Sequence, residues 1–336
     1  MSSRKKVVDT PFLAITLILV FLGLFLFVSA SLGLLAKEGA RFSAVAFNQI
    51  VYGLIGGSIA MYFTSRIDYT FWKRYSFYFF IFSLFVTVLV FVPGVGLSSG
   101  GATRWVDLGP LPSFQPVELL KLGFIIYFAA WISGIKTKIR TFQFGLLPLV
   151  IIMGIIAGVL LAQPDTGSLL VIASAGLAMF ITAGGRWKDV LIAGLIGAAL
   201  LAGLIYTRPY VLDRVKTFIN PGDDLQGSSY QLNQSLIAIG SGKMFGRGFG
   251  QSIQKFNYLP EATGDSIFAV IAEEWGFAGA TVLIFLFLMF ALRGLKIAAN
   301  SNDVFGGLLA TGIVILITVQ SLVNIASMLG VFPLTG

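Results

Sequence analysis

The segment PFLAITLILVFLGLFLFVSASLGL, residues Pro11–Leu34, contains no charged side chain. A helix needs about 20 mainly apolar residues to cross the hydrocarbon core of a bilayer, and this segment exceeds that length. It also exceeds the apolar core of a cleavable signal peptide, which has about 7–15 residues. We therefore interpret it as a first transmembrane helix that stays in the protein as an anchor.

The rest of the sequence repeats this pattern. Of its 336 residues, 57% are hydrophobic and 11% are charged, whereas a soluble domain has about 25% charged residues. The charges lie in short stretches between long apolar runs, which predicts an all-α polytopic membrane protein of about nine transmembrane helices. Eight further spans are expected at Ala44–Arg66, Tyr75–Val92, Pro116–Ile135, Phe144–Leu161, Gly167–Ala183, Val190–Tyr206, Ser266–Leu292 and Val304–Leu329.

The positions of Lys and Arg predict the orientation, because short cytoplasmic connections are enriched in them. If the N-terminus is cytoplasmic, the inner connections carry most of the basic residues, whereas the short outer loops hold only Lys37, Arg41 and Arg104. The net charge of +8 is then mainly a topology signal, and we expect no nucleic-acid partner. The inner basic residues are Arg4, Lys5, Lys6, Arg66, Lys73, Arg74, Lys136, Lys138, Arg140, Arg186, Lys188, Arg293 and Lys296.

The sequence has no cysteine and no histidine. This composition excludes disulfides and the usual zinc sites. Any general acid or base must therefore be Asp, Glu, Lys or Tyr.

One connection is much longer than the others. Residues 208–265 form an outer loop between the seventh and eighth spans, and loops longer than about 15 residues are usually functional or disordered. Tyr230–Ile239 is helix-compatible and aromatic residues recur, so we expect a folded segment. The glycines at 240–250 favour turns over a nucleotide-binding loop, because Ile237 and Met244 stand where a Walker motif needs Gly and Ser or Thr.

Ionisable residues within membrane spans are candidates for function. Glu118 and Lys121 share one helical face, and we weigh a mutual ion pair and a functional role equally. Asp165 lies in the turn Gln163-Pro-Asp-Thr-Gly167, where a helix-capping role is the simpler interpretation. For Glu273 and Glu274 we favour pairing with cations on neighbouring helices or a position at a helix break.

Asp265 lies where the long outer segment returns to the membrane. An ordinary helix N-cap is the simpler interpretation of this position. The alternative is a functional carboxylate at the membrane edge.

The run from Tyr258 to Glu274 resembles the signature of the SEDS family (shape, elongation, division and sporulation) of membrane glycosyltransferases. Tyr258-Leu-Pro-Glu-Ala is similar to the family's cell-division branch. Further similar blocks are Gly101–Trp105, Phe114–Lys121, Gln163–Gly167, Tyr230–Ser235, Gly242–Gln254, Gln320–Ile325 and Pro333–Gly336.

The sequence also departs from the family. The family usually has His-Thr-Asp-Phe around its catalytic aspartate and Gln-Pro-Ser-Glu in its fourth span, where this chain has Thr263–Ser266 and Gln115–Glu118. The resemblance implies one SEDS-type membrane domain over residues 1–336. The family's last outer loop and tenth helix are expected to be absent after Gly336.

The resemblance implies that the protein polymerises lipid II, the undecaprenyl-pyrophosphate-linked disaccharide-pentapeptide, on the outer face of the bacterial cytoplasmic membrane. Asp265 would be the catalytic base of a single inverting displacement, because a pyrophosphate leaves without an acid when cations take up its charge. The cation candidates are Arg104, Lys121, Arg214, Lys243, Arg247 and Lys255, of which Lys121, Arg214 and Lys255 are favoured. The expected substrate-binding residues are Arg104, Glu118, Lys121, Arg214, Gln231, Lys255 and Glu261.

No cofactor is certain, although Mg²⁺ or Mn²⁺ is a candidate. The resemblance also implies a class B penicillin-binding transpeptidase, other membrane proteins of the division machinery and membrane lipid as partners, with a location at the division septum. Two alternatives remain: a flippase that moves the same lipid across the bilayer, and a non-catalytic scaffold for a transpeptidase. A flippase requires polar residues through the full membrane thickness, and Glu273 and Glu274 are the residues that favour it.

Overall fold

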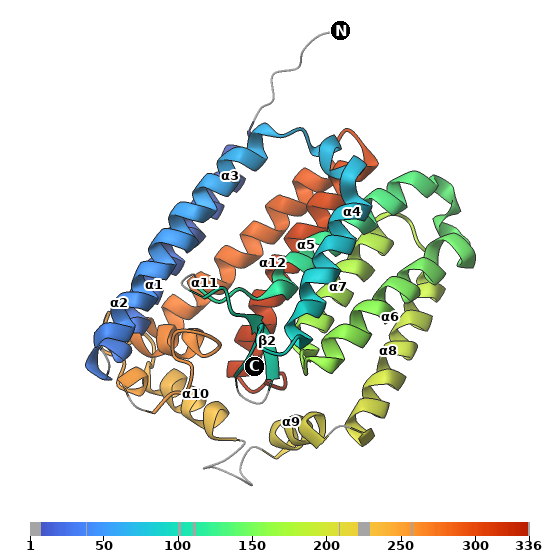
Figure 1. Cartoon of the computed structure of the whole chain (residues 1–336). Coiled ribbons are helices and arrows are strands. Elements are labelled where there is room, and N and C mark those ends of the chain that lie inside the picture. The colour runs from blue at the N-terminus through green and yellow to red at the C-terminus, as the bar shows by residue number, and fades with distance from the viewer. Residues whose placement is uncertain are drawn as a thin grey trace. The chain divides into compact units, whose positions relative to one another are not determined.

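The computed structural model shown in Figure 1 describes residues 8–37, 39–99, 102–109, 112–207, 209–220, 229–256 and 258–334. The contacts divide the chain into two compact units, each described here by itself. The first comprises Met1–Ala60 with Tyr230–Asn300, and the second Met61–Ser229 with Ser301–Gly336. Several residues used in the sequence argument lie outside the described residues: Arg4, Lys5, Lys6, Gly101, Arg208 and Gly336.

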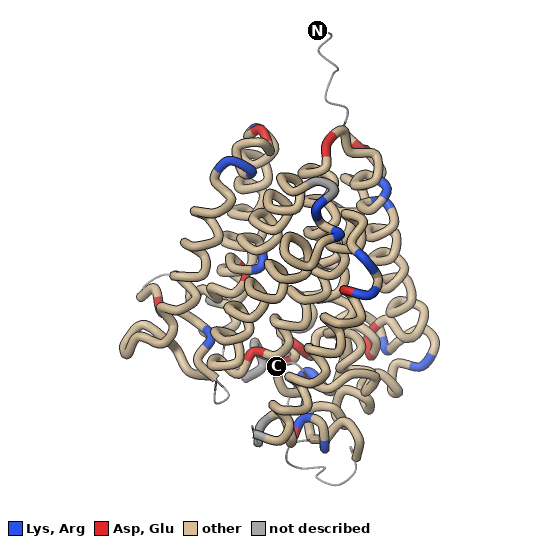
Figure 2. The backbone as a smooth tube through the Cα atoms, turned by 90° about the vertical axis from the view of Figure 1, so that its right-hand side faces the viewer, with Lys and Arg blue, Asp and Glu red and all other residues tan. Residues whose placement is uncertain are grey.

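The described residues contain eight helical segments long and apolar enough to cross a membrane, and a shorter apolar helix, α7 (Thr166–Thr182). These segments correspond to the nine predicted spans, and the prediction of an all-α polytopic membrane protein is confirmed. Figure 2 shows that most Lys, Arg, Asp and Glu residues lie near helix ends. This distribution agrees with apolar helix centres in contact with lipid.

The first unit is built on two long helices. The helix α1 (Thr10–Lys37) packs along α11 (Ile267–Ala299). The helix α10 (Tyr230–Ser241), which belongs to the long outer segment of residues 208–265, also packs on α11. The predicted second span consists of α2 (Gly39–Asn48), the π-helix η1 (Gln49–Gly56) and α3 (Gly57–Arg66), which continues into the second unit.

A break in α11 explains the glycine-rich segment that precedes it. Gly276 has φ 67° and ψ −167°, and the turn after α10 lies against this break. The N–H of Phe277 donates to the carbonyl of Lys243 (2.8 Å), and that of Arg247 donates to the carbonyl of Glu273 (3.0 Å). A Cβ on Gly246 would lie 2.0 Å from the carbonyl oxygen of Glu274. The glycines therefore form turns and allow close backbone packing, as the sequence favoured.

The second unit has a core of three helices: α5 (Pro116–Ile135), α7 and α12 (Val304–Met328), which lie side by side in Figure 1. Phe124, Phe128 and Met179 are fully buried in this core. Around it lie α4 (Tyr69–Val88), η2 (Leu89–Phe91), η3 (Lys136–Arg140), η4 (Phe142–Leu146), α6 (Leu147–Ala162), α8 (Trp187–Thr207) and α9 (Pro209–Ile219).

An antiparallel hairpin in the outer loop before α5 was not predicted. It consists of β1 (Gly96–Ser99) and β2 (Ala102–Val106), with a register irregularity between Leu97 and Ser98. Its strands are too short to show a clear alternation of apolar and polar residues. The predicted third span also begins too late, because α4 starts at Tyr69, where the Asp68 side chain accepts a hydrogen bond from the N–H of Thr70.

Gly312 gives a test of the core packing. A Cβ at this position would lie 2.5 Å from Cγ2 of Ile125 and 2.8 Å from Sδ of Met179. We expect Gly312→Ala to lower the free energy of unfolding by about 1–3 kcal/mol, because the added methyl group overpacks the core of the variant. Gly154→Ala is the matched control, since a Cβ there meets nothing within 4 Å. Unfolding curves in detergent that show equal stability for the two variants would contradict this packing.

Asp9 gives a pH test within the first unit. Both oxygens of Asp9 accept from the Arg293 guanidinium at 2.9 Å, and this hydrogen bonding holds the pKa of Asp9 below its ordinary value. The carboxylate therefore stabilises the folded state above about pH 4, and this contribution is lost as the pH falls through the lowered pKa. We expect Asp9→Asn to lower the unfolding temperature at neutral pH, and the difference from wild type to shrink in acid. A pH-independent difference would argue against the pairing.

Candidate active site and its charged clusters

Asp265 lies half-buried in a tight turn before α11. The carbonyl of Glu261 accepts hydrogen bonds from the N–H groups of Gly264 (2.9 Å) and Ser266 (3.1 Å), and Glu261 itself has φ 48°. The helix α11 begins directly after Ser266, whose side chain makes no capping hydrogen bond. The backbone of this turn fixes the position from which the carboxylate projects.

Two predicted substrate-binding residues lie next to Asp265. The side-chain amide of Gln231, on α10, donates to the hydroxyl of Ser266 at 3.0 Å, and the exposed Glu261 begins the same turn. The first unit therefore brings Asp265, Gln231 and Glu261 together. The sequence alone did not indicate that Ser266 links α10 to this turn.

Glu274 belongs to a buried network behind the turn. Its carboxylate pairs with Lys255 Nζ at 2.6 Å and accepts from the hydroxyl of Ser29 at 2.6 Å. The side chains of Lys255 and Glu274 are 0% and 1% exposed. The expectation that Lys255 binds pyrophosphate therefore disagrees with the structure, because its ammonium group is enclosed and already neutralised.

Glu273 holds the same loop through backbone donors. It accepts from the N–H groups of Ile253 (3.0 Å) and Gln254 (3.2 Å) and from the hydroxyl of Ser252, and it pairs with Arg247 Nε at 3.4 Å. The two adjacent carboxylates thus pair with cations and also lie beside the helix break. The cations come from the outer segment, however, and not from neighbouring helices as expected.

In the second unit, Glu118 and Lys121 form the ion pair that their spacing predicted. Lys121 Nζ lies 2.7 Å from the Glu118 carboxylate and 3.0 Å from the side-chain oxygen of Gln320 on α12. The Lys121 side chain is 3% exposed and that of Glu118 is 46% exposed. A solute therefore reaches Glu118 more easily than Lys121.

A second cluster surrounds the turn between α6 and α7. Arg104, on β2, donates to the carbonyls of Gln163 and Pro164. Asp165 is buried, and one of its oxygens accepts from the N–H of Ser168 at 3.1 Å and caps α7, whereas Oδ2 has no hydrogen-bond partner in the described part of the chain. The cap interpretation of Asp165 therefore agrees with the structure.

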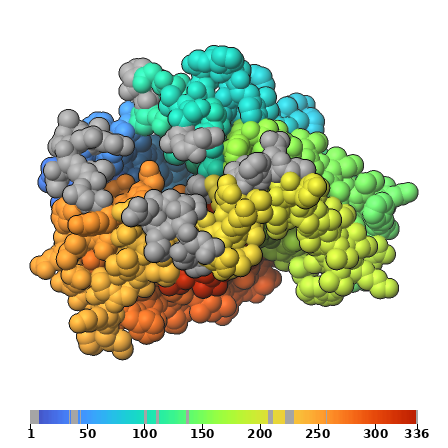
Figure 3. All heavy atoms as spheres, turned by 90° about the horizontal axis from the view of Figure 1, so that it is seen from below, coloured from blue at the N-terminus to red at the C-terminus, as the bar shows by residue number. Residues whose placement is uncertain are grey.

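Arg214 completes this cluster. It lies on α9, which is visible on the surface in Figure 3 (yellow), and its Nη1 lies 3.5 Å from the hydroxyl of Thr166. The second unit thus brings Arg104, Asp165 and Arg214 to one turn. The sequence proposed these residues separately, and only the folded hairpin and α9 bring them together.

The described residues hold no group of three or more Asp or Glu side chains placed to bind an ion.

This arrangement defines a class: a helical membrane protein whose outer segment folds around a carboxylate at the start of a transmembrane helix. Residues 9–336 match the family described as cell cycle protein, which comprises FtsW, RodA and SpoVE. The chain belongs to this family.

Curated relatives agree with this assignment. The chain is 36% identical to stage V sporulation protein E of Bacillus subtilis, with 100% of this chain and 91% of that protein covered. It is 37% identical to the probable peptidoglycan glycosyltransferase FtsW of Trichlorobacter lovleyi, with 98% and 86% covered. The resemblance to the cell-division branch is thereby supported.

Two solved structures share the fold. One, described as the structural coordination of polymerization and crosslinking by a peptidoglycan synthase complex, has a TM-score of 0.78 at 25% identity and covers 98% of this chain and 89% of its own. The rod shape determining protein RodA of Thermus thermophilus has a TM-score of 0.69 at 25% identity, with 99% and 88% covered.

The buried ion pair of Lys255 and Glu274 gives a test of its structural role. Lys255→Met leaves a buried carboxylate without its cation, so we expect a loss of about 3–5 kcal/mol in the free energy of unfolding. The double variant Lys255→Met/Glu274→Gln removes the unpaired charge and is expected to recover part of this loss. Lys243→Met, at an exposed position of the same segment, is the control, and equilibrium unfolding in detergent is the measurement. Equal stability of the two single variants would show that the ion pair does not hold the segment.

Proposed function

We propose that this chain is a peptidoglycan glycosyltransferase that polymerises lipid II at the outer face of the bacterial cytoplasmic membrane during cell division. The names of the FtsW relatives support the transferase activity. The observation that carries the proposal is the half-buried Asp265, which lies in a hydrogen-bonded turn at the start of α11.

The chemistry needs one base. The hydroxyl oxygen of the acceptor sugar attacks the anomeric carbon of the donor, and Asp265 accepts the hydroxyl proton. The bond from the anomeric carbon to the pyrophosphate oxygen breaks, and undecaprenyl pyrophosphate leaves with the bonding electrons. A single displacement of this kind inverts the anomeric configuration.

Cations must stabilise the pyrophosphates of the donor and the acceptor. We assign this role to Arg104 and Arg214, because Lys255 and Lys121 are both enclosed and each is already paired with a carboxylate. Arg guanidinium groups suit this role because they bind phosphate oxygens in pairs. Mg²⁺ or Mn²⁺ is proposed only as a partner of the substrate's own phosphates.

A flippase is the weaker alternative. In the described part of the second unit, the buried charged residues are Lys121 and Asp165 near one end of the helices and Asp189 near the other. Apolar side chains such as Phe124 and Phe128 fill the space between them. Glu273 and Glu274 are enclosed by their own partners, which leaves them poorly suited to line a transport path.

The proposal includes the topology and the partners. The N-terminus is cytoplasmic, and the segment from α9 to the start of α11 is extracytoplasmic. A class B penicillin-binding transpeptidase and other division proteins are the proposed partners, and the septum is the proposed location. The solved peptidoglycan synthase complex that shares this fold supports a transpeptidase partner in general.

The test compares wild type, Asp265→Asn and Asp107→Asn after reconstitution with lipid II. A general base contributes about 10²–10⁴-fold to a rate, so we expect Asp265→Asn to lose at least about 100-fold in the rate of strand formation. Lipid II binding should persist, because the amide keeps the shape of the carboxylate. Asp107→Asn, in the exposed outer loop, should polymerise as wild type does.

Glycan strands resolved on gels, lipid II binding and lipid translocation are measured on the same preparations. Unchanged polymerisation by Asp265→Asn would remove this residue as the base. Translocation without polymerisation by the wild type would favour the flippase. Activation of a transpeptidase by a chain that makes no strands would favour the scaffold.

A further inference from the structure

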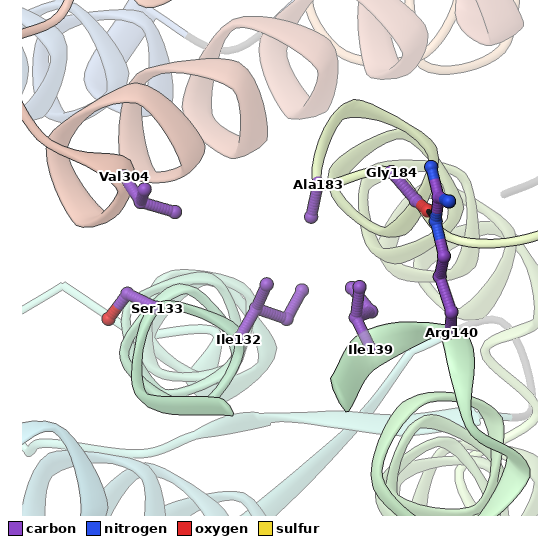
Figure 4. A pocket seen from close by; sticks show the side chains of 7 residues that line it. All are labelled: Ile132, Ser133, Ile139, Arg140, Ala183, Gly184 and Val304. Carbon is purple, nitrogen blue, oxygen red and sulfur yellow. Dashed lines mark hydrogen bonds between the residues drawn. The ribbon is translucent and has the colours of Figure 1, made fainter. Parts of the chain in front are cut away.

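A pocket lies at the opposite end of the second unit from the Arg104 cluster. Its volume is about 510 Å³, and it is lined by residues from the end of α5, from η3, from the turn after α7 and from the start of α12. Figure 4 shows Ile132 and Ile139 pointing into it, with Val304 on one side and Arg140 on the other. None of these residues belongs to the candidate active site.

Ile132, Ile139, Ala183 and Val304 give the pocket a partly apolar lining. Ile132 and Ile139 are each 2% exposed. A Cβ on Gly145 would lie 1.9 Å from the carbonyl oxygen of Ile139, and a Cβ on Gly185 would lie 2.2 Å from the Phe180 ring. These close contacts pack η3 and the turn after α7 tightly against their neighbours.

Arg140 places a cation at the rim. Its Nε donates to the carbonyl of Gly184 at 3.3 Å, and its Nη atoms make no hydrogen bond to the described residues. The guanidinium is exposed and keeps donors for a ligand. An Arg fork of this kind binds phosphate oxygens more specifically than an ammonium group does.

This end of the second unit is rich in basic residues. Lys73 lies 5.7 Å from the centre of the Phe305 ring, next to Val304, and Arg186 pairs with Asp189 at the start of α8. The helix ends and connections here carry Arg66, Lys73, Arg74, Lys136, Lys138, Arg140, Arg186 and Lys188 against Asp68, Asp189 and Asp303. An excess of positive charge attracts the anionic lipids of a cytoplasmic leaflet.

We propose that this pocket binds the phosphate and glycerol region of an anionic phospholipid from the cytoplasmic leaflet. Arg140 binds the phosphate, and the walls around Ile132 and Ile139 contact the glycerol and the first methylene groups. A soluble phosphate would gain nothing from these apolar walls, and a neutral lipid would gain little from the basic surroundings. The pocket faces the cytoplasm in the proposed orientation.

The experiment titrates the full chain in detergent with dioctanoyl phosphatidylglycerol. The unfolding temperature and the lipid-bound fraction in native mass spectrometry are the readouts, since a ligand that binds only the folded state raises its stability. Dioctanoyl phosphatidylcholine has the same acyl chains but no net negative charge, so it tests whether binding needs an anionic headgroup. Glycerol 3-phosphate and inorganic phosphate, which have no chains, test the apolar walls.

We expect phosphatidylglycerol to bind at least tenfold more tightly than the other three probes, about 1.4 kcal/mol. Arg140→Gln should weaken its binding about tenfold, and Arg140→Lys should restore only part of it. Ala183→Leu fills the pocket without changing the charge and should also weaken binding. Lys188→Gln, an exposed cation outside the pocket, is the matched control and should bind as wild type.

Three outcomes would overturn the proposal. Equal binding of phosphatidylcholine would remove the role of charge. Equal binding of glycerol 3-phosphate or inorganic phosphate would identify a soluble anion as the ligand. Equal losses in Arg140→Gln and Lys188→Gln, or no loss in either, would show that lipid binds through general surface charge and not in this pocket.

Discussion

The enclosed ion pair between Lys255 and Glu274 determines the architecture of the outer segment. A charge in an apolar interior is stable only when its partner and its hydrogen bonds are complete, and here Ser29 supplies a further contact. Ser29 lies on α1, Lys255 in the outer segment and Glu274 on α11. Their pairing requires that all three lie together, and Asp265 follows Lys255 in the chain by only ten residues.

Periodicity and charge predicted the membrane helices well. Each span consists of a long apolar run, and the physical requirement for such a run is strong in a bilayer. The span Pro116–Ile135 coincides with α5, because proline suits the first turn of a helix. The hairpin β1–β2 and the π-helix η1 were missed, since their conformations depend on contacts that no local pattern encodes.

The candidate site was predicted in part. The family resemblance located Asp265, and the spacing of Glu118 and Lys121 predicted their ion pair. The role of Lys255 was misjudged because sequence gives the charge of a residue but not its partners. Ser29 carried a weak signal as a polar residue in an apolar span, whereas the link between Gln231 and Ser266 depends on how α10 packs.

Both units use backbone groups as well as side chains to organise their polar clusters. Arg104 binds two carbonyls of the turn before α7, and Glu273 binds two N–H groups of the outer segment. A loop fixed in this way loses little further freedom when a ligand binds. The fold thus prepares its charged groups in advance, which is a general requirement for electrostatic stabilisation of a transition state.

The break at Gly276 also solves a problem of length. The helix α11 has 33 residues, so a straight form would extend about 50 Å, well beyond a hydrocarbon core of about 30 Å. The part after Gly276 is about 35 Å long and matches that thickness with a modest tilt. The first turns of α11 therefore do not have to fit within the thickness of the hydrocarbon core. Their direction is set by contacts with the outer segment instead of by the bilayer.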